Sequence, residues 1–592
     1  MKKSVGDFGM QEEKLENQLR LALSLSEEQR EETPDLNVGY EPLTNRWQLI
    51  VNYYGDIEEV ARQLSAEMVV LLGQYAILTI EEELIGQLTD FPQVLFVEKP
   101  TLLYTSVAVG RRVSCVEGVQ SSRLPESQRL FGAGVLIGVP DSGIDYRHPD
   151  FRNADGTTRI LALWDQVVGN GANRYGLGQI YTESAINAAL AESAAGSRRV
   201  APAGTLLSVD STGHGTGVAG IAAGNGRASG GANRGMAPEA QLVVVRLSAG
   251  EERGFAKTTS LMMAVDFCLR VAGTAEKPIA VNISYGNNYG SHTGSSLLEG
   301  FLDQAARSYR CSIVVGSGNE GVTGRHAFVQ LGEAEQEVSF AVSAGETGIR
   351  LQVWKNYFDR FQITLEAPSG ESVRLIPADE TVSAVLGRTQ LIYYYADPKP
   401  DSTQQELLLE LIPAAGDVLT GGVWTLRFAP ERILEGNVDL WLPVAEATNR
   451  TTEFLRPSPE TTLTIPSTAE RVISVSAYNA ATGRFASFSG QGLLRGGGRK
   501  PDLCAPGVDV LTASPGGGYT RRSGTSFAAP FVTGGAALLL EWGIVKGNDP
   551  FLYGEKLKAY LIQGARRLPG FTEWPNPQAG WGALCVEDSL PG

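Results

Sequence analysis

The sequence predicts an α/β protein whose core is a doubly wound parallel sheet, preceded by an α+β domain and interrupted by an antiparallel β-sandwich. Continuous apolar runs such as Val135–Val139 are separated by helical patterns such as Leu261–Val271, as expected of strands buried on both faces of a parallel sheet. Before them, in residues 1–106, short strand and helix patterns alternate. Between about 333 and 445, apolar and polar residues alternate with a period of two, which is typical of half-buried antiparallel strands.

The N-terminal region, residues 1–106, is expected to form the compact α+β unit. Leu15, Leu19 and Leu23 recur at helical spacing within the charge-rich stretch 11–32. The patterns that follow predict a strand at Arg46–Tyr54, a helix at Ile57–Leu64, one or two strands in Met68–Ile80, a helix at Glu81–Leu88 and a strand at Val94–Val97.

The parallel sheet is expected to occupy residues 107–332 and 446–592. Helices are predicted at Leu261–Val271 and Ser295–Ala306. Its predicted strands are Val135–Val139, Leu242–Val245, Ile279–Ile283, Ile313–Val315 and Val472–Val475. Functional residues of such a sheet gather at the carboxyl ends of its strands.

The intervening residues 333–445 are expected to form the antiparallel β-sandwich. Ile349, Leu351 and Val353 alternate with polar neighbours, and Trp424 begins a similar alternation. About eight such runs predict two packed sheets with a core of their own. With no cluster of acids, bases or nucleophiles in it, this region is interpreted as a rigid accessory domain.

Composition limits the partners and the location. The chain has 592 residues, 43% apolar content and a formal charge of −16, so it is long enough for several domains. No basic block offsets the acidic charge, which argues against nucleic acid or an anionic membrane as a partner. Its start lacks the apolar stretch of a secretory signal. Five scattered cysteines without metal spacing are interpreted as reduced thiols of a cytoplasmic protein.

Three short motifs carry residues suited to nucleophilic catalysis. Ser526 lies in a small-residue turn that opens into an apolar helix, His214 lies at a glycine-rich helix start, and Asp141 follows an apolar strand. A serine hydroxyl needs a base to remove its proton as it attacks, and a carboxylate orients that base. The order of acid, base and nucleophile is one of the arrangements known for this triad.

These motifs resemble those of the subtilisin-like serine proteases, the subtilases. The resemblance implies a serine endopeptidase in which Asp141, His214 and Ser526 form the triad. Ser312–Gly321 is similar to the family segment whose asparagine completes the oxyanion hole, which gives Asn319 that role. Val281–Gly286 is similar to the strand that pairs with the substrate backbone. The substrate-binding residues implied are Ser284, Tyr285, Gly286, Val315, Gly316, Ser317 and Gly318.

The inserted sandwich, read as a jelly roll, and the N-terminal segments Lys14–Leu19 and Asp35–Tyr40 narrow the resemblance to clostridial Csp-type spore-germination proteases. This resemblance implies that residues 1–106 form a ferredoxin-like prodomain, which assists folding and stays bound as an inhibitor after cleavage. The small residues of Leu103–Ser106 indicate self-cleavage after Ser106. The implied substrate is a spore-germination pro-enzyme, and the implied location extends to the spore.

Two acidic features and one proline qualify the resemblance. Pro140 stands where the family has an aliphatic residue, and proline cannot donate a ladder hydrogen bond, so the strand end is expected to be altered. Glu320, expected as an exposed acid at the rim of the primary pocket, either favours a basic or polar side chain or does nothing specific. Asp145, Asp150 and Asp155 are candidate calcium ligands without regular spacing, so no metal or other cofactor is predicted.

Two other functions stay open at this point. One is a catalytically silent binding or signalling protein on the same scaffold, although retention of all four residues of the triad and oxyanion hole stands against it. The other is carbohydrate binding by the sandwich, with Trp354, Trp424 or Trp441 as stacking platforms. At a period of two, those tryptophans are more typical of a core.

Overall fold

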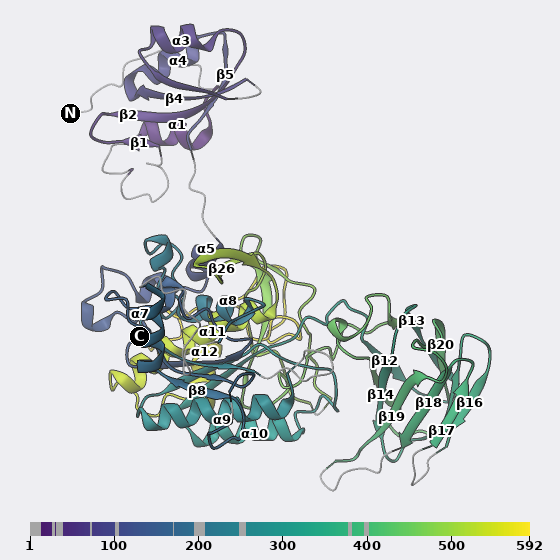
Figure 1. Ribbon diagram of the computed structural model, residues 1–592. Helices are drawn as coiled ribbons and strands as arrows, with labels where there is room; N and C mark the ends of the chain where they lie inside the picture. The colour runs from purple at the N-terminus through teal and green to yellow at the C-terminus, as the bar shows by residue number, and fades with distance from the viewer. Residues whose placement is uncertain are drawn as a thin grey trace. The chain divides into compact units, whose positions relative to one another are not determined.

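The computed structural model describes residues 14–25, 30, 39–71, 74–100, 106–169, 171–194, 208–247, 256–376, 382–395, 402–495 and 497–591. The chain divides into two compact units, Met1–Tyr104 and Thr105–Gly592. Figure 1 draws both units.

The first unit is an antiparallel sheet with a β-α-β-β-α-β chain order. β2 lies between β4 and β5, and β3 pairs with β4, which is the predicted ferredoxin-like arrangement. Trp47, Leu49 and Val51 are fully buried in its core. Of the helical stretch 11–32, the structure describes α1; residues 11–13, 26–29 and 31–32 lie outside the described residues. The elements are α1 Asn17–Ser24, β1 Tyr40–Glu41, β2 Arg46–Tyr53, α3 Ile57–Gln63, β3 Glu67–Leu71, β4 Tyr75–Glu81, α4 Ile85–Asp90 and β5 Val94–Glu98.

The second unit contains a nine-stranded, mostly parallel sheet in the order β24-β23-β11-β10-β6-β9-β7-β8, with β25 beside β23. Only the β7–β8 and β23–β24 pairs are antiparallel among its described strands. This confirms the predicted doubly wound sheet. Its strands are β6 Leu136–Asp141, β7 Ile160–Asp165, β8 Gln179–Thr182, β9 Gln241–Arg246, β10 Ile279–Ile283, β11 Cys311–Gly316, β23 Ile473–Asn479, β24 Arg484–Phe485 and β25 Leu503–Pro506.

Helices cover both faces of this sheet (Figure 1). Because side chains alternate along a strand, Ile137 packs in one core cluster with α8 and α11, whereas Leu136 packs in another with α9 and α10. Further described elements complete the unit. The helices are α5 Ser106–Val113, α6 Val116–Val119, α7 Glu183–Ala194, α8 His214–Ala223, α9 Thr258–Thr274, α10 Leu297–Ser308, α11 Thr525–Leu540 and α12 Gly554–Gln563, and the hairpin strands are β26 Val510–Ser514 and β27 Gly518–Arg522.

The helical stretch Thr525–Val545, which begins with α11, is long and apolar enough to cross a membrane by length and composition, but 83% of its most apolar window is buried inside the protein. Such burial is typical of a core helix. Its residues Val532 and Leu539 are fully buried against the sheet.

An antiparallel β-sandwich interrupts the second unit. A six-stranded sheet packs against a five-stranded one, and a shared core joins Phe340 and Trp424 of one to Leu351 and Leu440 of the other. Two strands lie beyond the expected limits 333–445, so the sandwich is longer at both ends. Its strands are β12 His326–Gln330, β13 Gln336–Val342, β14 Ile349–Asn356, β15 Arg360–Glu366, β16 Ser372–Leu375, β17 Val382–Leu386, β18 Thr389–Tyr395, β19 Gln404–Pro413, β20 Gly422–Arg432, β21 Asn437–Trp441 and β22 Glu453–Phe454.

The proposed sugar platforms of the sandwich are buried. Trp354 is 9% exposed, Trp424 is 0% exposed and Trp441 is 1% exposed. A stacking platform must present its ring face to solvent, so the carbohydrate-binding interpretation of these residues is wrong.

The expectation of five reduced cysteines is also wrong. Cys115, between α5 and α6, forms a disulfide with Cys585 near the C-terminus, while Cys268, Cys311 and Cys504 are buried free thiols. The two partners are separated by 470 positions, and their pairing cannot be read from sequence spacing. Disulfides are typical of oxidising compartments, so the cysteines no longer argue for a cytoplasmic location.

Pro140 leaves the strand end intact. The parallel register of β6 with β9 continues through Pro140 opposite Val245 and Asp141 opposite Arg246, and Leu247 N–H donates to the Asp141 carbonyl at 2.8 Å. The missing N–H of Pro140 therefore does not disturb the backbone beside Asp141, contrary to the expectation.

Candidate active site

Three elements bring Asp141, His214 and Ser526 to one region. Asp141 ends β6, His214 begins α8 and Ser526 is the second residue of α11. His214 and Ser526 line one cavity of about 560 Å³ together with Ser284 and Asn319. As expected for a parallel sheet, the site lies where strands end and helices begin.

Asp141 and His214 form a close pair. His214 Nδ1 lies 2.7 Å from Asp141 Oδ1, which also accepts a hydrogen bond from the Ser142 backbone N–H at 2.7 Å. Asp141 is fully buried, and its Oδ2 has no hydrogen-bond partner among the residues that the structure describes. Burial lowers the pKa of His214, but the charge and hydrogen bond of Asp141 and the charge of Asp210 outweigh it, so the pKa is raised. The pair therefore favours a ring that accepts a proton at Nε2.

Asp210 fixes the start of α8, a role that the sequence interpretation missed. Its Oδ1 accepts from the Ser142 hydroxyl (2.8 Å) and the Gly213 N–H (2.9 Å), and its Oδ2 accepts from the N–H (2.8 Å) and hydroxyl (2.6 Å) of Thr216. A carboxylate that accepts N–H groups at a helix start is a capping signal. The position of Asp210 four residues before His214 could have revealed it.

The Ser526 hydroxyl lies at the first turn of α11. Gly524, just before it, has φ of +146°, a conformation that favours glycine. Ser526 Oγ donates to the Ser284 carbonyl at 3.4 Å, and the Ser284 hydroxyl donates to the Ser526 carbonyl at 3.1 Å. No hydrogen bond joins Ser526 to the described His214 ring, as is common for catalytic contacts that tighten when substrate binds.

The Asn319 side chain is oriented by its neighbours. Its Oδ1 accepts hydrogen bonds from the backbone N–H (3.0 Å) and the hydroxyl (3.3 Å) of Thr525. With Oδ1 occupied, the Nδ2 amide is the group that Asn319 offers to the cavity. Gly318, at φ +92°, has no room for a side chain, because an added Cβ would lie 2.5 Å from Thr464 Cγ2.

The expected substrate-binding residues separate into two groups. Ser284, Tyr285, Gly286, Gly316 and Gly318 line the cavity. Val315 instead packs in the core beneath the sheet, and Ser317 is fully buried with its N–H bonded to the Val475 carbonyl. Their side chains therefore do not form the cavity wall, a correction that follows from side-chain alternation along β11 and its extension.

Glu320 is not the exposed rim acid that the sequence suggested, because only 3% of it is exposed. Its Oε2 accepts from the Thr323 hydroxyl at 2.6 Å and from the Ala445 N–H at 3.3 Å. Burial raises the pKa of Glu320, the Thr323 hydrogen bond opposes this, and the charge of Glu446 raises it further. Val444, Glu446 and Thr464, which the sequence interpretation missed, also line the cavity.

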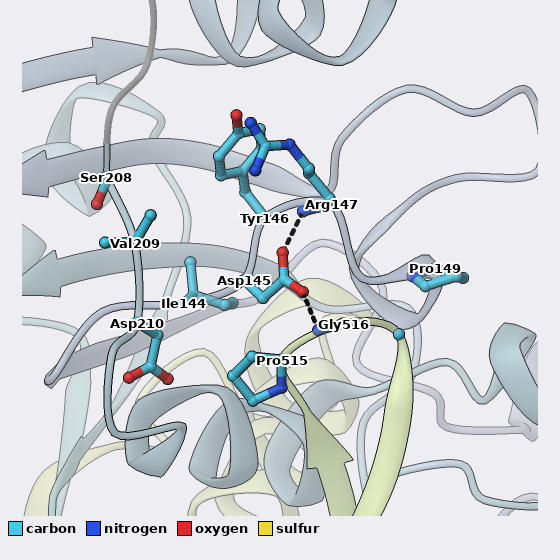
Figure 2. Close-up of a pocket in the computed structure, with 11 residues that line it drawn as sticks. Ile144, Asp145, Tyr146, Arg147, Pro149, Ser208, Val209, Asp210, Pro515 and Gly516 are labelled. Carbon is cyan, nitrogen blue, oxygen red and sulfur yellow. Dashed lines mark hydrogen bonds between the residues drawn. The ribbon is translucent and has the colours of Figure 1, made fainter. Parts of the chain in front are cut away.

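A second cavity of about 640 Å³ lies beside the start of α8 (Figure 2). There Asp145 accepts from the Arg147 N–H at 3.1 Å and the Gly516 N–H at 2.8 Å. Asp150 accepts from the Ala228 N–H and the Tyr519 hydroxyl, and Asp155 from the N–H and hydroxyl of Thr157. Protein donors thus bond to each of the three candidate calcium ligands named from the sequence.

The predicted cleavage segment is only partly described. Residues 103–105 lie outside the described residues, and Ser106 begins α5. A bond after Ser106 would have to leave the helical conformation to bind as an extended strand. The structure thus defines the active site itself, which is formed by the end of β6, the starts of α8 and α11 and the loop that carries Asn319.

Two family models match the chain. The model of the subtilase family matches residues 132–357 and 434–582, and the model of the Csp protease B prodomain matches residues 13–101. The solved structure of the Clostridium perfringens CspB protease is 36% identical in sequence and has a TM-score of 0.73. The alignment covers 81% of this chain and 96% of the CspB chain.

Two curated relatives match the chain over a smaller share or at lower identity. Serine protease AprX of Bacillus subtilis is 34% identical over 22% of this chain, and the PIII-type proteinase of Lactococcus lactis is 22% identical over 80% of it. The chain spans 32% of the first and 25% of the second.

Proposed function

Because the chain belongs to the subtilase family, we propose that it is an active serine endopeptidase in which Ser526 is the nucleophile, His214 the base and Asp141 the orienting acid. The observation that carries the proposal is the 2.7 Å contact between Asp141 and His214 at a cavity that His214 shares with Ser526 and Asn319. The rival interpretation, a silent binding protein, gives no reason to keep this pair aligned.

In the proposed reaction, His214 Nε2 takes the proton of Ser526 as Oγ attacks the substrate carbonyl carbon. Asp141, bonded at Nδ1, fixes the tautomer and stabilises the imidazolium that forms. His214 then gives the proton to the leaving amine, which leaves an acyl-enzyme on Ser526. In the second step, His214 takes a proton from the attacking water and returns it to Ser526 Oγ as the acyl bond breaks. The raised pKa of His214 makes it a stronger base for the first step.

Charge on the carbonyl oxygen must be stabilised as it develops. We assign this role to the Nδ2 amide of Asn319 and the backbone N–H of Ser526. The hydrogen bonds from Thr525 to Asn319 Oδ1 hold the amide in place before the reaction, and preorganised donors of this kind are worth about 3–4 kcal/mol each.

The substrate is proposed to bind as an extended peptide. Ser284, Tyr285 and Gly286 follow β10 and line the cavity, where their backbone could pair with a strand added to the edge. Gly286 has no room for a side chain, since an added Cβ would lie 2.5 Å from Thr464 Oγ1.

The N-terminal unit is proposed to be removed by self-cleavage after Ser106 and to stay bound as an inhibitor. The Csp-type prodomain match supports this, and so do Val69 and Val70, 57% and 48% exposed on β3, because exposed apolar surface favours a partner. The resemblance to Csp-type proteases supports a spore-germination pro-enzyme as the external substrate.

Labelling with a fluorophosphonate tests the enzyme proposal. After removal of the prodomain, the probe should label wild type and the exposed-site control Ser122→Ala, but neither Ser526→Ala nor His214→Ala. Asn319→Ala should keep labelling and lose about 10²–10³ in turnover. An unlabelled wild type with a native unfolding transition would favour the silent binding protein.

A further inference from the structure

One wall of the candidate active-site cavity comes from the segment that leaves the sandwich. β21, Asn437–Trp441, is a strand of the six-stranded sheet. Val444 and Glu446, a few residues later, line the cavity that holds His214 and Ser526. We call residues 442–447 the exit segment. The inserted domain thus delivers side chains directly to the site.

The exit segment is held by hydrogen bonds to the catalytic domain. Leu442 N–H donates to the Arg325 carbonyl at 2.9 Å, and the buried Asn288 amide donates to the Leu442 carbonyl at 3.1 Å. Ala445 N–H donates to Glu320 at 3.3 Å. The backbone of the exit segment is therefore held in place at Leu442 and Ala445, and the exposed side chain of Glu446 lines the cavity from the next residue.

Trp441, just before the exit segment, is fixed by stacking. Its ring lies 4.2 Å from the ring of His292 and 4.9 Å from that of His326, centroid to centroid. All three side chains are 1% exposed. His292 also bonds the Leu463 carbonyl through Nδ1 at 2.8 Å. This packing joins the sandwich to the catalytic domain next to the cavity.

Two carboxylates line the cavity, those of Glu320 and Glu446. The charge of Glu446 raises the pKa of Glu320, and the charge of Arg325 lowers it. Neither forms an ion pair with any residue that the structure describes. Of the nearby cations, Arg325 donates to the carbonyls of Asn449 and Thr452, and Arg522 donates to that of Thr212.

We propose that this cavity takes the lysine or arginine side chain of a peptide substrate, and that Glu446 on the exit segment selects it. The inference rests on the proposed peptidase function. A cation entering the cavity gains an ion pair with the exposed carboxylate of Glu446 and comes close to the buried carboxylate of Glu320, and both contacts favour a positive charge. The residue at the reacting carbonyl is then basic.

Peptide cleavage with matched substrates tests the proposal. The residue before the scissile bond is lysine, norleucine, glutamine or glutamate in one otherwise fixed peptide, and kcat/KM is measured with prodomain-free enzyme. Wild type should cleave the lysine peptide at least about tenfold faster than the norleucine peptide. The Glu446→Gln change should reduce that ratio by about fivefold, and Glu446→Lys should bring it below one, as expected for one charge pair near a surface.

The controls separate charge from folding. Glu460→Gln removes an exposed carboxylate outside the cavity and should leave the lysine-to-norleucine ratio unchanged. Higher salt should lower the ratio in wild type more than in Glu446→Gln, because ions screen the pair. Every variant is titrated with the fluorophosphonate, so that rates refer to active enzyme.

The outcomes distinguish this inference from the proposed function. Labelled wild type with no preference for lysine, or with a preference for glutamine, would overturn the basic specificity and leave the peptidase intact. A lysine preference that Glu446→Gln and Glu446→Lys both leave unchanged would overturn the role of Glu446. Unlabelled wild type would overturn both. Cleavage after Ser106 is no counterexample, because tethering raises its effective concentration enough to offset a poor fit.

Discussion

The Asp141–His214 pair couples the electrostatics of the site to its pH dependence. Burial lowers the pKa of His214 and Asp141 raises it by more, so the acid limb of kcat/KM should lie above the ordinary histidine value of about 6.5. Activity requires the neutral ring. It should therefore rise with pH through that limb.

The Asp141→Asn change isolates this effect. Without the carboxylate charge, burial dominates, so the acid limb should move to lower pH, while kcat falls by about 10⁴ because the wrong tautomer is favoured. A pH profile of kcat/KM on a small peptide measures both. A profile with an unshifted limb would show that another group titrates.

At the scale of one element, Asp210 connects stability to the position of His214. Four hydrogen bonds from Ser142, Gly213 and Thr216 end on its carboxylate. The Asp210→Ala change should lower the unfolding free energy at pH 7 by about 2–3 kcal/mol, since bonds to a charged group are lost. The exposed control Asp417→Ala should have little effect on thermal unfolding.

The pH dependence of that loss has a defined sign. Burial raises the pKa of Asp210 but its hydrogen bonds lower it by more, so the folded value is below the unfolded one. Its contribution is present above the unfolded value of about 3.9 and is lost as pH falls through the folded value. The difference in melting temperature between wild type and Asp210→Ala should therefore shrink toward pH 3. A constant difference would contradict the hydrogen-bonded carboxylate.

At the scale of the whole molecule, the Cys115–Cys585 disulfide joins the two ends of the second unit. Closing a loop with a sequence separation of 470 is worth about 6 kcal/mol when its effect is entirely on the entropy of the unfolded chain. Reduction should lower the melting temperature of wild type, whereas the double variant Cys115→Ser/Cys585→Ser should not respond. Thiol titration of the unreduced, unfolded protein should find three free thiols; five would exclude the bond.

Self-processing is a second property of the whole molecule. Wild type should yield a fragment ending at Ser106 and one starting at Val107 that co-elute, whereas Ser526→Ala should remain one chain of 592 residues. Because the reaction is tethered, its rate should not depend on protein concentration. Cleavage of the Ser526→Ala variant in a protease-free preparation would contradict self-cleavage. Wild type that stays uncut would contradict the proposed cleavage after Ser106.

The sequence by itself determined the layers of the fold and the residues suited to the chemistry. Uninterrupted apolar strands such as Leu242–Val245 and the motifs around Asp141, His214 and Ser526 are local signals, because periodicity and turn chemistry act over a few residues. Their order along the chain was enough to suggest which of them work together.

Only the tertiary structure decided which distant groups meet. The Cys115–Cys585 bond, the burial of Glu320 and the arrival of Glu446 at the cavity each depend on contacts between segments far apart in sequence. Trp354, Trp424 and Trp441 look alike in sequence, yet their burial against particular strands excluded a sugar platform. Burial and pairing are properties of the packed chain, and no local pattern specifies them.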